Sequence, residues 1–346
     1  MTIPIHADEV TTSWLEEALG ARTGSLNGFS AAPVGTGQVA SSFRLNLDWS
    51  EEGFPSSLVL KSPSVDETSR KTGADFGLYA KEVGWYQQLA ARSDVRCPAC
   101  HGAFIEGDRF ALLLEDCAPA EQGDQLGGAT LDDLSKCLLE GAKLHGAFFN
   151  DRAMETHPLL AVSSEMAAAR SGIFAMFWEP FKERYQGRLG PEIFELGDDF
   201  LANYHAFGAR ASAAVGVAHG DFRIDNMLFG GADGRVVVLD WQTLGYGAPM
   251  ADVAYLLGTS IADPAVRKRE ERALVGGYFS NLRDMEISPD EDALWQDYRV
   301  LSATGFIMAV TSSMLVVRTE RGDELFAVMC ERSAWQMMDL EMLSCL

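Results

Sequence analysis

The chain contains the stretch HGDFRIDN at residues 219–226, and a glycine-rich turn followed by the apolar run VVVL at 236–239 leads from it to Asp240. The stretch carries a carboxylate, Asp221, and an amide, Asn226, five residues apart, and the apolar run predicts a strand that ends at a second carboxylate. Hard oxygen atoms of this kind are the ligands that Mg²⁺ prefers. The ordered set therefore predicts a magnesium-dependent centre, although neither aspartate would indicate one alone.

The bulk composition is that of a globular protein with an unusual negative charge. The chain has 346 residues, of which 47% are apolar and 23% charged, and its net charge is −22. This length fits about two domains or one large one. Because nucleic acids and anionic membranes attract basic surfaces, the charge argues against both as partners. The acidity would suit a cationic substrate, but solubility alone also explains it.

The chain is expected to be cytoplasmic, with reduced thiols. Residues 1–20 show neither the basic start nor the apolar core of a signal peptide. The longest uncharged run, 300–317, includes six Ser, Thr and Gly residues, which favours a buried helix over a membrane span. The motif CPACH at 97–101 matches a haem-attachment pattern and offers zinc ligands, but it lacks an export signal and a fourth ligand, so its cysteines are expected to act as small apolar residues.

The predicted elements divide the chain into a strand-rich first third and a helix-rich remainder. Strands are expected at 42–49, 57–61, 104–105 and 110–114, the last two forming a hairpin. Helices are expected at 8–19, 74–91, 130–148, 163–185 and 191–214, and from about 249, 264, 289 and 323. We therefore predict an α+β, bilobal fold with a small β-rich N-lobe (1–114), a hinge (115–118) and a larger, mainly helical C-lobe (119–346).

The stretch 219–226, together with the strand and aspartate that follow, resembles the catalytic segment of the aminoglycoside phosphotransferase and choline kinase family, a branch of the kinase-like superfamily. Its spelling is similar to that of ecdysteroid-kinase-like proteins and of kinase-like domains fused to some acyl-CoA dehydrogenases. The resemblance is specific over 219–252, moderate over 35–116 and weak beyond about 260. It implies a protein-kinase-like fold and Mg²⁺-dependent transfer of the γ-phosphate of ATP, or alternatively GTP, to a hydroxyl group.

The resemblance also implies roles for the residues of this stretch. Asp221 would be the catalytic base that orients the acceptor hydroxyl, and Asn226 and Asp240 would be metal ligands. Arg223 would neutralise charge on the γ-phosphate; the alternatives are a surface cation or a partner of Asp225. Two further residues are expected to brace the loop by hydrogen bonding: His219 and Asp252.

Nucleotide binding is expected in the N-lobe. Lys61 would contact the α- and β-phosphates and pair with Glu82 on the following helix. In the segment 35–42 the phosphates would be approached by Gly35, Gly37, Ser41 and Ser42. This segment matches neither G-x-G-x-x-G nor the Walker pattern. At the hinge, the Glu115 carbonyl and the Cys117 N–H would bind adenine.

The acceptor is expected to be a small hydroxylated molecule. Pro249 signals the start of a helix soon after Asp240, which leaves too little chain for the activation segment of a protein kinase. An acceptor pocket is expected near the 300–317 helix and near a group of mainly aromatic residues. Core packing would also explain this group, which consists of Phe174, Met176, Phe177, Trp178 and Phe181. An amino sugar or other cation would suit the acidity, and a sterol-like or acyl-type alcohol would suit the aromatic residues.

Three other functions compete with a small-molecule kinase. A non-catalytic, kinase-like nucleotide-binding protein is the main alternative, although it would require a defect in the catalytic set that the sequence does not show. A protein kinase is opposed by the short segment after Asp240. A dinucleotide-binding oxidoreductase lacks its glycine motif and would leave residues 219–240 unexplained. The sequence does not predict an oligomeric state.

Overall fold

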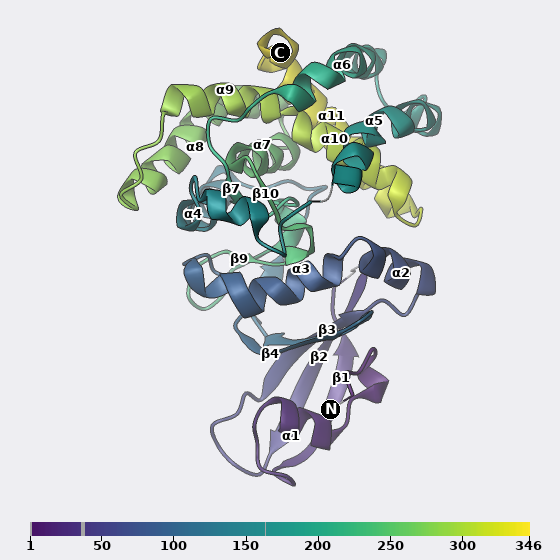
Figure 1. The fold of residues 1–346 in the computed structure, drawn as a ribbon, viewed down its shortest axis with the longest axis vertical. Coiled ribbons are helices and arrows are strands. Elements are labelled where there is room, and N and C mark those ends of the chain that lie inside the picture. The colour runs from purple at the N-terminus through teal and green to yellow at the C-terminus, as the bar shows by residue number, and fades with distance from the viewer. Residues whose placement is uncertain (1, 36–38, 163) are drawn as a thin grey trace. The chain divides into compact units, whose positions relative to one another are not determined.

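The protein is represented by a computed structural model that describes residues 2–35, 39–162 and 164–346, with the backbone alone over 164–171. The chain forms two compact units (Figure 1). The first comprises Met1–Arg92, Arg96–Ala120 and Leu239–Thr243, and the second Ser93–Val95, Glu121–Val238 and Leu244–Leu346. The first unit is built on a sheet and the second mainly on helices, so the α+β prediction is confirmed. The predicted boundaries of the N-lobe, the hinge and the C-lobe, and the functions assigned to them, remain predictions.

A five-stranded antiparallel sheet forms the first unit, in the order β1-β2-β3-β5-β4. Its strands are β1 (Leu26–Pro33), β2 (Ala40–Trp49), β3 (Ser57–Pro63), β4 (Cys100–Glu106) and β5 (Arg109–Glu115). The predicted hairpin is present as β4 and β5, and Gly107 supplies its turn with a φ of +60°. A positive φ favours glycine, so this turn could be predicted from the sequence.

Helices cover both faces of this sheet, which explains the continuous apolar run in β5. Leu113 belongs to the cluster on the face covered by α1 (Thr12–Ala18). Leu112 and Leu114 point the other way, into the cluster that contains Tyr79 and Val83 of α3 (Leu78–Gly84). Successive side chains of a strand point to opposite faces, so both sets must be apolar when both faces are buried.

Two helices of the first unit differ from the prediction. The single helix expected over 74–91 is instead α2 (Glu67–Asp75), α3 and a π-helical turn at Trp85–Leu89. The break lies at Gly77, whose φ is +67° and cannot continue a right-handed helix. The helix expected from residue 8 begins at Thr12, because Val10 is extended and the Thr11 side chain caps the first turn.

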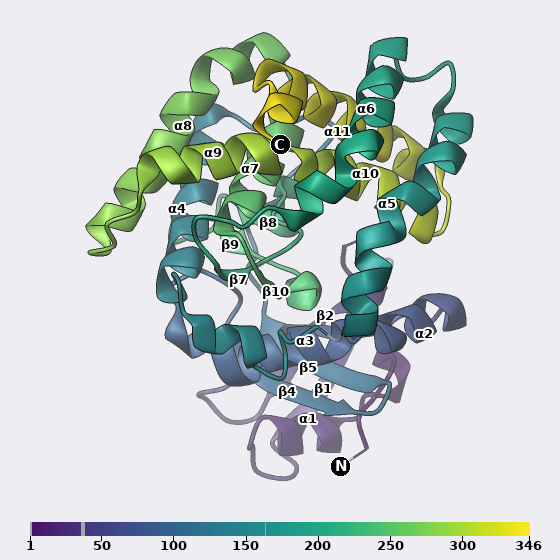
Figure 2. The same cartoon turned by 45° about the horizontal axis from the view of Figure 1, so that its top comes forward.

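Eight helices and five short strands of the described chain form the second unit. The helices are α4 (Leu131–Ala147), α5 (Ser164–Tyr185), α6 (Pro191–Ala209), α7 (Pro249–Ser260), α8 (Pro264–Asp284), α9 (Glu291–Leu301), α10 (Ala303–Leu315) and α11 (Glu320–Asp339). The strands are β6 (Glu121–Gln122), β7 (Gly216–Ala218), β8 (Met227–Phe229), β9 (Val237–Val238) and β10 (Gly245–Gly247). Helix α7 is almost entirely buried and contacts α4, α9, α10 and α11 (Figure 2).

Most helix starts in this unit follow the capping signals of the sequence. Thr130 accepts a hydrogen bond from the Asp133 N–H at 3.1 Å and opens α4 as predicted. The uncharged run 300–317 is divided between the end of α9 and the whole of α10, because the chain turns at Ser302. Within the described chain, no helix is long and apolar enough to cross a membrane.

The aromatic group proposed for an acceptor pocket lies largely in the core. Phe174, Trp178 and Phe181 are fully buried, and they pack with residues of α6, α10 and α11. Met176, by contrast, is 68% exposed. The core-packing interpretation is therefore correct for the three buried rings, because a helix packed between others must bury its apolar face.

We predict opposite effects of alanine at two glycines of α6. A Cβ atom added at Gly197 would lie 2.1 Å from the buried Trp178 ring, whereas nothing lies within 4 Å of one added at Gly208. Gly197→Ala should lower the free energy of unfolding by about 1–3 kcal/mol through overpacking. Gly208→Ala should raise it by up to about 1 kcal/mol through helix propensity. Urea denaturation of both variants tests this, and a Gly197→Ala variant as stable as Gly208→Ala would contradict it.

Candidate active site

The loop 219–226 leaves β7 and ends in a 3-10 turn, Ile224–Asn226, before β8 begins. Strand β7 is held by antiparallel pairing with β10. Gly220 has a φ of +82°, which a residue with a side chain rarely adopts. This turn directs the chain away from β7 immediately before Asp221.

One buried carboxylate fixes the start of this loop. Asp252, in the first turn of α7, accepts hydrogen bonds from the backbone N–H groups of His219 at 2.6 Å and Gly220 at 3.0 Å. It also lies 3.1 Å from Nε2 of His145 on α4. Burial opposes the ionisation of Asp252, but its contacts with His145 and the backbone hold the pKa of this carboxyl below its usual value. His219 contributes in turn, since its Nδ1 accepts the Asp221 N–H at 3.3 Å.

Three side chains hold the carboxylate of Asp221. Arg223 Nε lies 3.1 Å from Oδ1 and 3.3 Å from Oδ2, and Asn226 Nδ2 donates to Oδ2 at 2.7 Å. The hydroxyl of Tyr255 on α7 donates to Oδ1 at 2.9 Å. The Asp221 side chain keeps 16% of its surface exposed, so a substrate group can still approach it. An ionised carboxylate offers about four acceptor positions, and these contacts place two donors on each oxygen, so a further donor would replace one of them.

Tyr255 was not among the site residues predicted from the sequence. Its place, three residues after Asp252, was the available signal, because residues three apart on a helix lie on one face. Because Asp252 contacts the loop, a residue on the same face of the helix also lies close to that loop. Tyrosine on an apolar helix otherwise indicates only core packing, so the sequence could not separate the two possibilities.

Arg223 is engaged by two carboxylates. Its Nη1 lies 2.7 Å from Asp225 Oδ2, and its Nε contacts Asp221. Burial opposes the charge of the guanidinium, but these acidic neighbours raise its pKa above the ordinary value. The pairing with Asp225 that the sequence suggested as one alternative is present, and a contact between Arg223 and a phosphate stays a prediction.

Asn226 is oriented by its neighbour. Its Nδ2 donates both to the Asp221 carbonyl oxygen at 2.9 Å and to the Asp221 carboxylate at 2.7 Å. The reverse orientation would place oxygen against two oxygen acceptors, so this network assigns the amide. The Oδ1 atom of Asn226 is consequently turned away from Asp221, as a metal ligand would need.

In the first unit, one ammonium group serves two carboxylates. Lys61 Nζ lies 2.6 Å from Glu82 Oε1 and 2.8 Å from Asp240 Oδ1. The expected pair with Glu82 is therefore present, and the contact with Asp240 is additional. Burial alone would lower the pKa of Lys61, but the two carboxylates raise it. Burial raises the pKa of Glu82 to about 7, which the Lys61 charge opposes and the Asp240 charge reinforces.

Asp240 is held in an uncommon backbone conformation, with a φ of +64°. The next residue, Trp241, stacks on Trp85 with ring centroids 3.8 Å apart, and both rings are fully buried. This stack anchors residues 239–243 to the first unit, although they are distant in sequence from its sheet. Gln242 Nε2 donates to the second carboxylate oxygen of Asp240 at 3.3 Å, so both oxygens are oriented.

The segment 35–42, for which phosphate binding is predicted, is only partly described. Gly35 has a φ of +75°, a conformation that suits glycine, while Gly37 lies outside the described residues. Ser41 and Ser42 belong to β2, and Ser42 is the cross-strand neighbour of Lys61. The contact of these residues with phosphate remains a prediction.

The predicted hinge begins at the end of β5, and ion pairs secure its side chains. The Glu115 carboxylate pairs with Arg96 at 2.7 Å and accepts the Ala99 N–H at 2.9 Å. Asp116 pairs with Arg44 at 2.8 Å. These contacts fix the side chains, whereas adenine would contact the backbone. Adenine binding by the backbone of Glu115 and Cys117 remains a prediction.

The predicted metal ligands, Asn226 and Asp240, are few in number and lie in different units. Among the described residues, no three His, Cys, Asp or Glu side chains are placed to hold a metal ion. Mg²⁺ in phosphoryl-transfer sites usually takes only one or two protein ligands, with phosphate and water completing its shell. Asn226 in the second unit and Asp240 in the first each carry an oriented side chain, and their binding to Mg²⁺ stays a prediction.

A sheet unit with a Lys-Glu pair and a helical unit with the loop H-x-D-x-x-x-x-N define a kinase-like phosphotransferase. Residues 51–284 match the phosphotransferase enzyme family known as APH. This match covers more than half of the chain, so the protein belongs to this family, and the predicted family is confirmed. The narrower likeness to ecdysteroid-kinase-like proteins remains a prediction.

Solved structures share this fold at low sequence identity. The ADP-bound aminoglycoside phosphotransferase APH(2'')-Ib has 12% identity and a TM-score of 0.52, over 95% of this chain and 99% of that one. Choline kinase from Cryptosporidium parvum has 11% identity and a TM-score of 0.52, over 97% of this chain and 90% of that one. These likenesses confirm the predicted protein-kinase-like fold.

One curated relative is matched over a short segment. Probable acyl-CoA dehydrogenase IBR3 from Arabidopsis thaliana is 42% identical over 66 residues, which is 19% of this chain and 8% of that protein. The chain therefore aligns with only a small part of this relative's length. Nothing about dehydrogenase activity follows for this chain.

We predict that Asp252→Asn destabilises the protein in a pH-dependent manner. The variant loses a charged acceptor for two N–H groups and should lower the free energy of unfolding at pH 7 by about 2–4 kcal/mol. The folded pKa of Asp252 lies below its usual value of 3.8, so the stabilisation is complete above that pH and is lost as the pH falls through the folded value. Urea denaturation at several pH values should show the difference from wild type shrinking in acid. A difference that is independent of pH would contradict this role.

Proposed function

We propose that this protein is a kinase that transfers the γ-phosphate of ATP, in the presence of Mg²⁺, to a hydroxyl group of a small molecule. GTP is an alternative donor. The observation that carries this proposal is the Asp221 carboxylate, which is held by three donors yet remains 16% exposed. Membership of the phosphotransferase enzyme family supports the reaction class.

Asp221 would act as the base. Its carboxylate accepts a hydrogen bond from the acceptor hydroxyl, directs the oxygen toward the γ-phosphorus, and takes the proton as the new P–O bond forms and the bond to the β-phosphate oxygen breaks. The donors already in place orient both oxygens before substrate binds, which lowers the cost of reaching the reactive geometry. Asn226 and Asp240 would hold Mg²⁺, which neutralises phosphate charge when bound.

Lys61 would bind the nucleotide through its α- and β-phosphates. Its ammonium group is charged and partly accessible, and its present partners are Glu82 and Asp240. Phosphate oxygens would replace part of the interaction with Asp240, which would then be free to bind the metal. Glu82 would remain the fixed partner, because its side chain is only 2% exposed.

A small acceptor is supported by the chain that follows Asp240. Residues 241–248 hold only a 3-10 turn and the short strand β10 before α7 begins at Pro249. Protein kinases need a much longer segment here to bind a peptide. Three of the rings that favoured a sterol-like alcohol are core residues, so the charge of −22 now favours a cationic acceptor such as an amino sugar.

We predict that Asp221→Asn abolishes phosphoryl transfer and leaves nucleotide affinity nearly unchanged. Asparagine keeps the size of the side chain but cannot accept the proton. Calorimetric titration of ATP, with Mg²⁺ and with EDTA, measures binding, and a screen of alcohols, amino sugars and sterols with the wild type measures transfer. A variant with normal turnover would exclude Asp221 as the base. Metal-dependent ATP binding without transfer to any acceptor or to water would favour the alternative of a non-catalytic nucleotide-binding protein.

We predict that Asp240→Asn weakens the binding of Mg²⁺·ATP. The positive φ of this residue is tolerated by asparagine as well as aspartate, so the backbone should be preserved. Loss of the negative charge removes a metal ligand, and affinity for Mg²⁺·ATP should fall about 10-fold or more, by analogy with about 1.5–3 kcal/mol for a charged hydrogen bond. Binding in EDTA is the control. Unchanged affinity in Mg²⁺ would contradict the role of Asp240 as a ligand.

A further inference from the structure

We propose that Tyr255 is a positioning residue for the reaction: its hydroxyl holds the Asp221 carboxylate in the orientation that receives the acceptor hydroxyl. This inference rests on the proposed function, since it assigns Tyr255 a role in the step that Asp221 performs. It goes beyond the resemblance on which the other roles depend, because that resemblance assigned no role to Tyr255.

The contact between these two residues is short and shielded from water. The Tyr255 hydroxyl lies 2.9 Å from Asp221 Oδ1, and the tyrosine is 1% exposed. Burial and the neighbouring carboxylate raise the pKa of Tyr255 well above its ordinary value, so the hydroxyl keeps its proton and acts as the donor. A hydrogen bond to a charged acceptor away from water is stronger than the same bond at a surface.

Tyr255 controls one carboxylate oxygen and Asn226 the other. Tyr255 donates to Oδ1, and Asn226 Nδ2 donates to Oδ2. The Nε atom of Arg223 lies between them, 3.1 Å and 3.3 Å from the two oxygens. Without the tyrosine hydroxyl, Oδ1 would be held by Arg223 alone, and the carboxylate would be free to rotate toward the guanidinium. The base would remain present but lose its orientation.

Helix α7 sets the loop backbone and the carboxylate together. Asp252 binds the backbone at His219 and Gly220, and Tyr255, one helical turn later, binds the side chain of Asp221. The helix is itself anchored further along, where the Thr259 carbonyl accepts a hydrogen bond from Arg332 of α11 at 2.9 Å. A rigid, buried helix is a more accurate support for a catalytic side chain than a loop would be.

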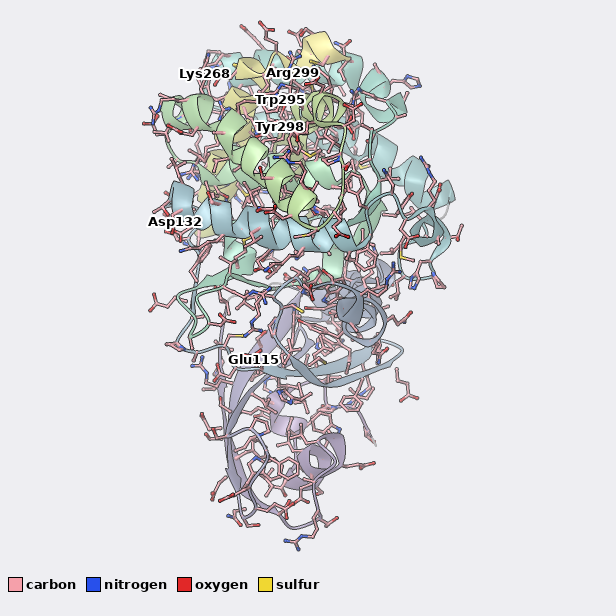
Figure 3. All side chains as sticks on the ribbon, turned by 90° about the vertical axis from the view of Figure 1, so that its left-hand side faces the viewer. Glu115, Asp132, Lys268, Trp295, Tyr298 and Arg299 are labelled. Atoms are coloured by element: carbon pink, nitrogen blue, oxygen red, sulfur yellow. The ribbon has the colours of Figure 1, made fainter. Side chains whose placement is uncertain are left out.

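The test compares Tyr255→Phe with the matched control Tyr298→Phe. Tyr298, on α9, is labelled in Figure 3. It is also fully buried, and its hydroxyl donates to a carboxylate, Glu271 Oε1, at 2.7 Å. Each variant therefore loses one buried hydroxyl and one hydrogen bond to a carboxylate, and Tyr298→Phe also removes the acceptor of Gln336 Nε2 at 2.9 Å, but only Tyr255 contacts Asp221. Release of inorganic phosphate from Mg²⁺·ATP, with water as the acceptor, gives kcat and KM without knowledge of the natural acceptor.

Tyr255→Phe should lower kcat about 10–100-fold, the effect expected from one hydrogen bond to a charged group, and leave KM for ATP and the calorimetric Kd of Mg²⁺·ATP unchanged. Tyr298→Phe should lower the melting temperature at least as much as Tyr255→Phe does. At temperatures below its melting transition, it should keep the wild-type kcat.

The outcomes separate this inference from the proposed function. Equal kcat values for Tyr255→Phe and Tyr298→Phe would overturn the role of Tyr255 and leave the proposed function intact. A rise in KM for ATP with an unchanged kcat in Tyr255→Phe would also overturn it, since Tyr255 would then act on nucleotide binding and not on Asp221. No phosphate release by folded wild-type protein, with water or with any acceptor in the screen, would overturn the proposed function and this inference with it.

Discussion

The geometry of the candidate active site depends on the buried carboxylate of Asp252. An isolated charge in a protein interior is strongly unfavourable, and here two backbone N–H groups and the His145 ring compensate it. These same contacts determine where the chain leaves β7 and therefore the position of Asp221. The compensation has a structural consequence: the charge is stable only if the loop stays where it is, so the loop and α7 must form together.

A second constraint operates in the first unit, where Lys61 neutralises Glu82 and Asp240 together. Its ammonium group opposes the effect of burial on Glu82 and lies 2.8 Å from the Asp240 carboxylate, so one buried cation orients two acidic side chains. Asp240 also carries a positive φ, a conformation that persists only where the surroundings enforce it. The stacked rings of Trp85 and Trp241 provide this support and keep the adjacent carboxylate facing Lys61.

The sequence predicted features that depend on local signals. The hairpin at Gly107 and the cap at Thr130 each need only a few neighbouring residues, and both are present. Contacts between distant residues were predicted only where the resemblance supplied them, as for Lys61 and Glu82, and the contact between Lys61 and Asp240 was missed. The rings of α5 were ambiguous for another reason: an apolar stripe has the same pattern whether it meets a substrate or a neighbouring helix.

The separation between loop support and acceptor recognition explains how one fold can serve different acceptors. Solved relatives of this fold include an aminoglycoside phosphotransferase and a choline kinase, each with 12% identity to this chain or less. In this protein the groups that hold the Asp221 carboxylate come from the loop itself and from the buried helix α7. None of these groups needs to contact the acceptor beyond its reacting hydroxyl. With Asp221 as the proposed base, surfaces that recognise the rest of the acceptor can diverge while its carboxylate keeps its position, so the fold predicts the reaction class more closely than the substrate.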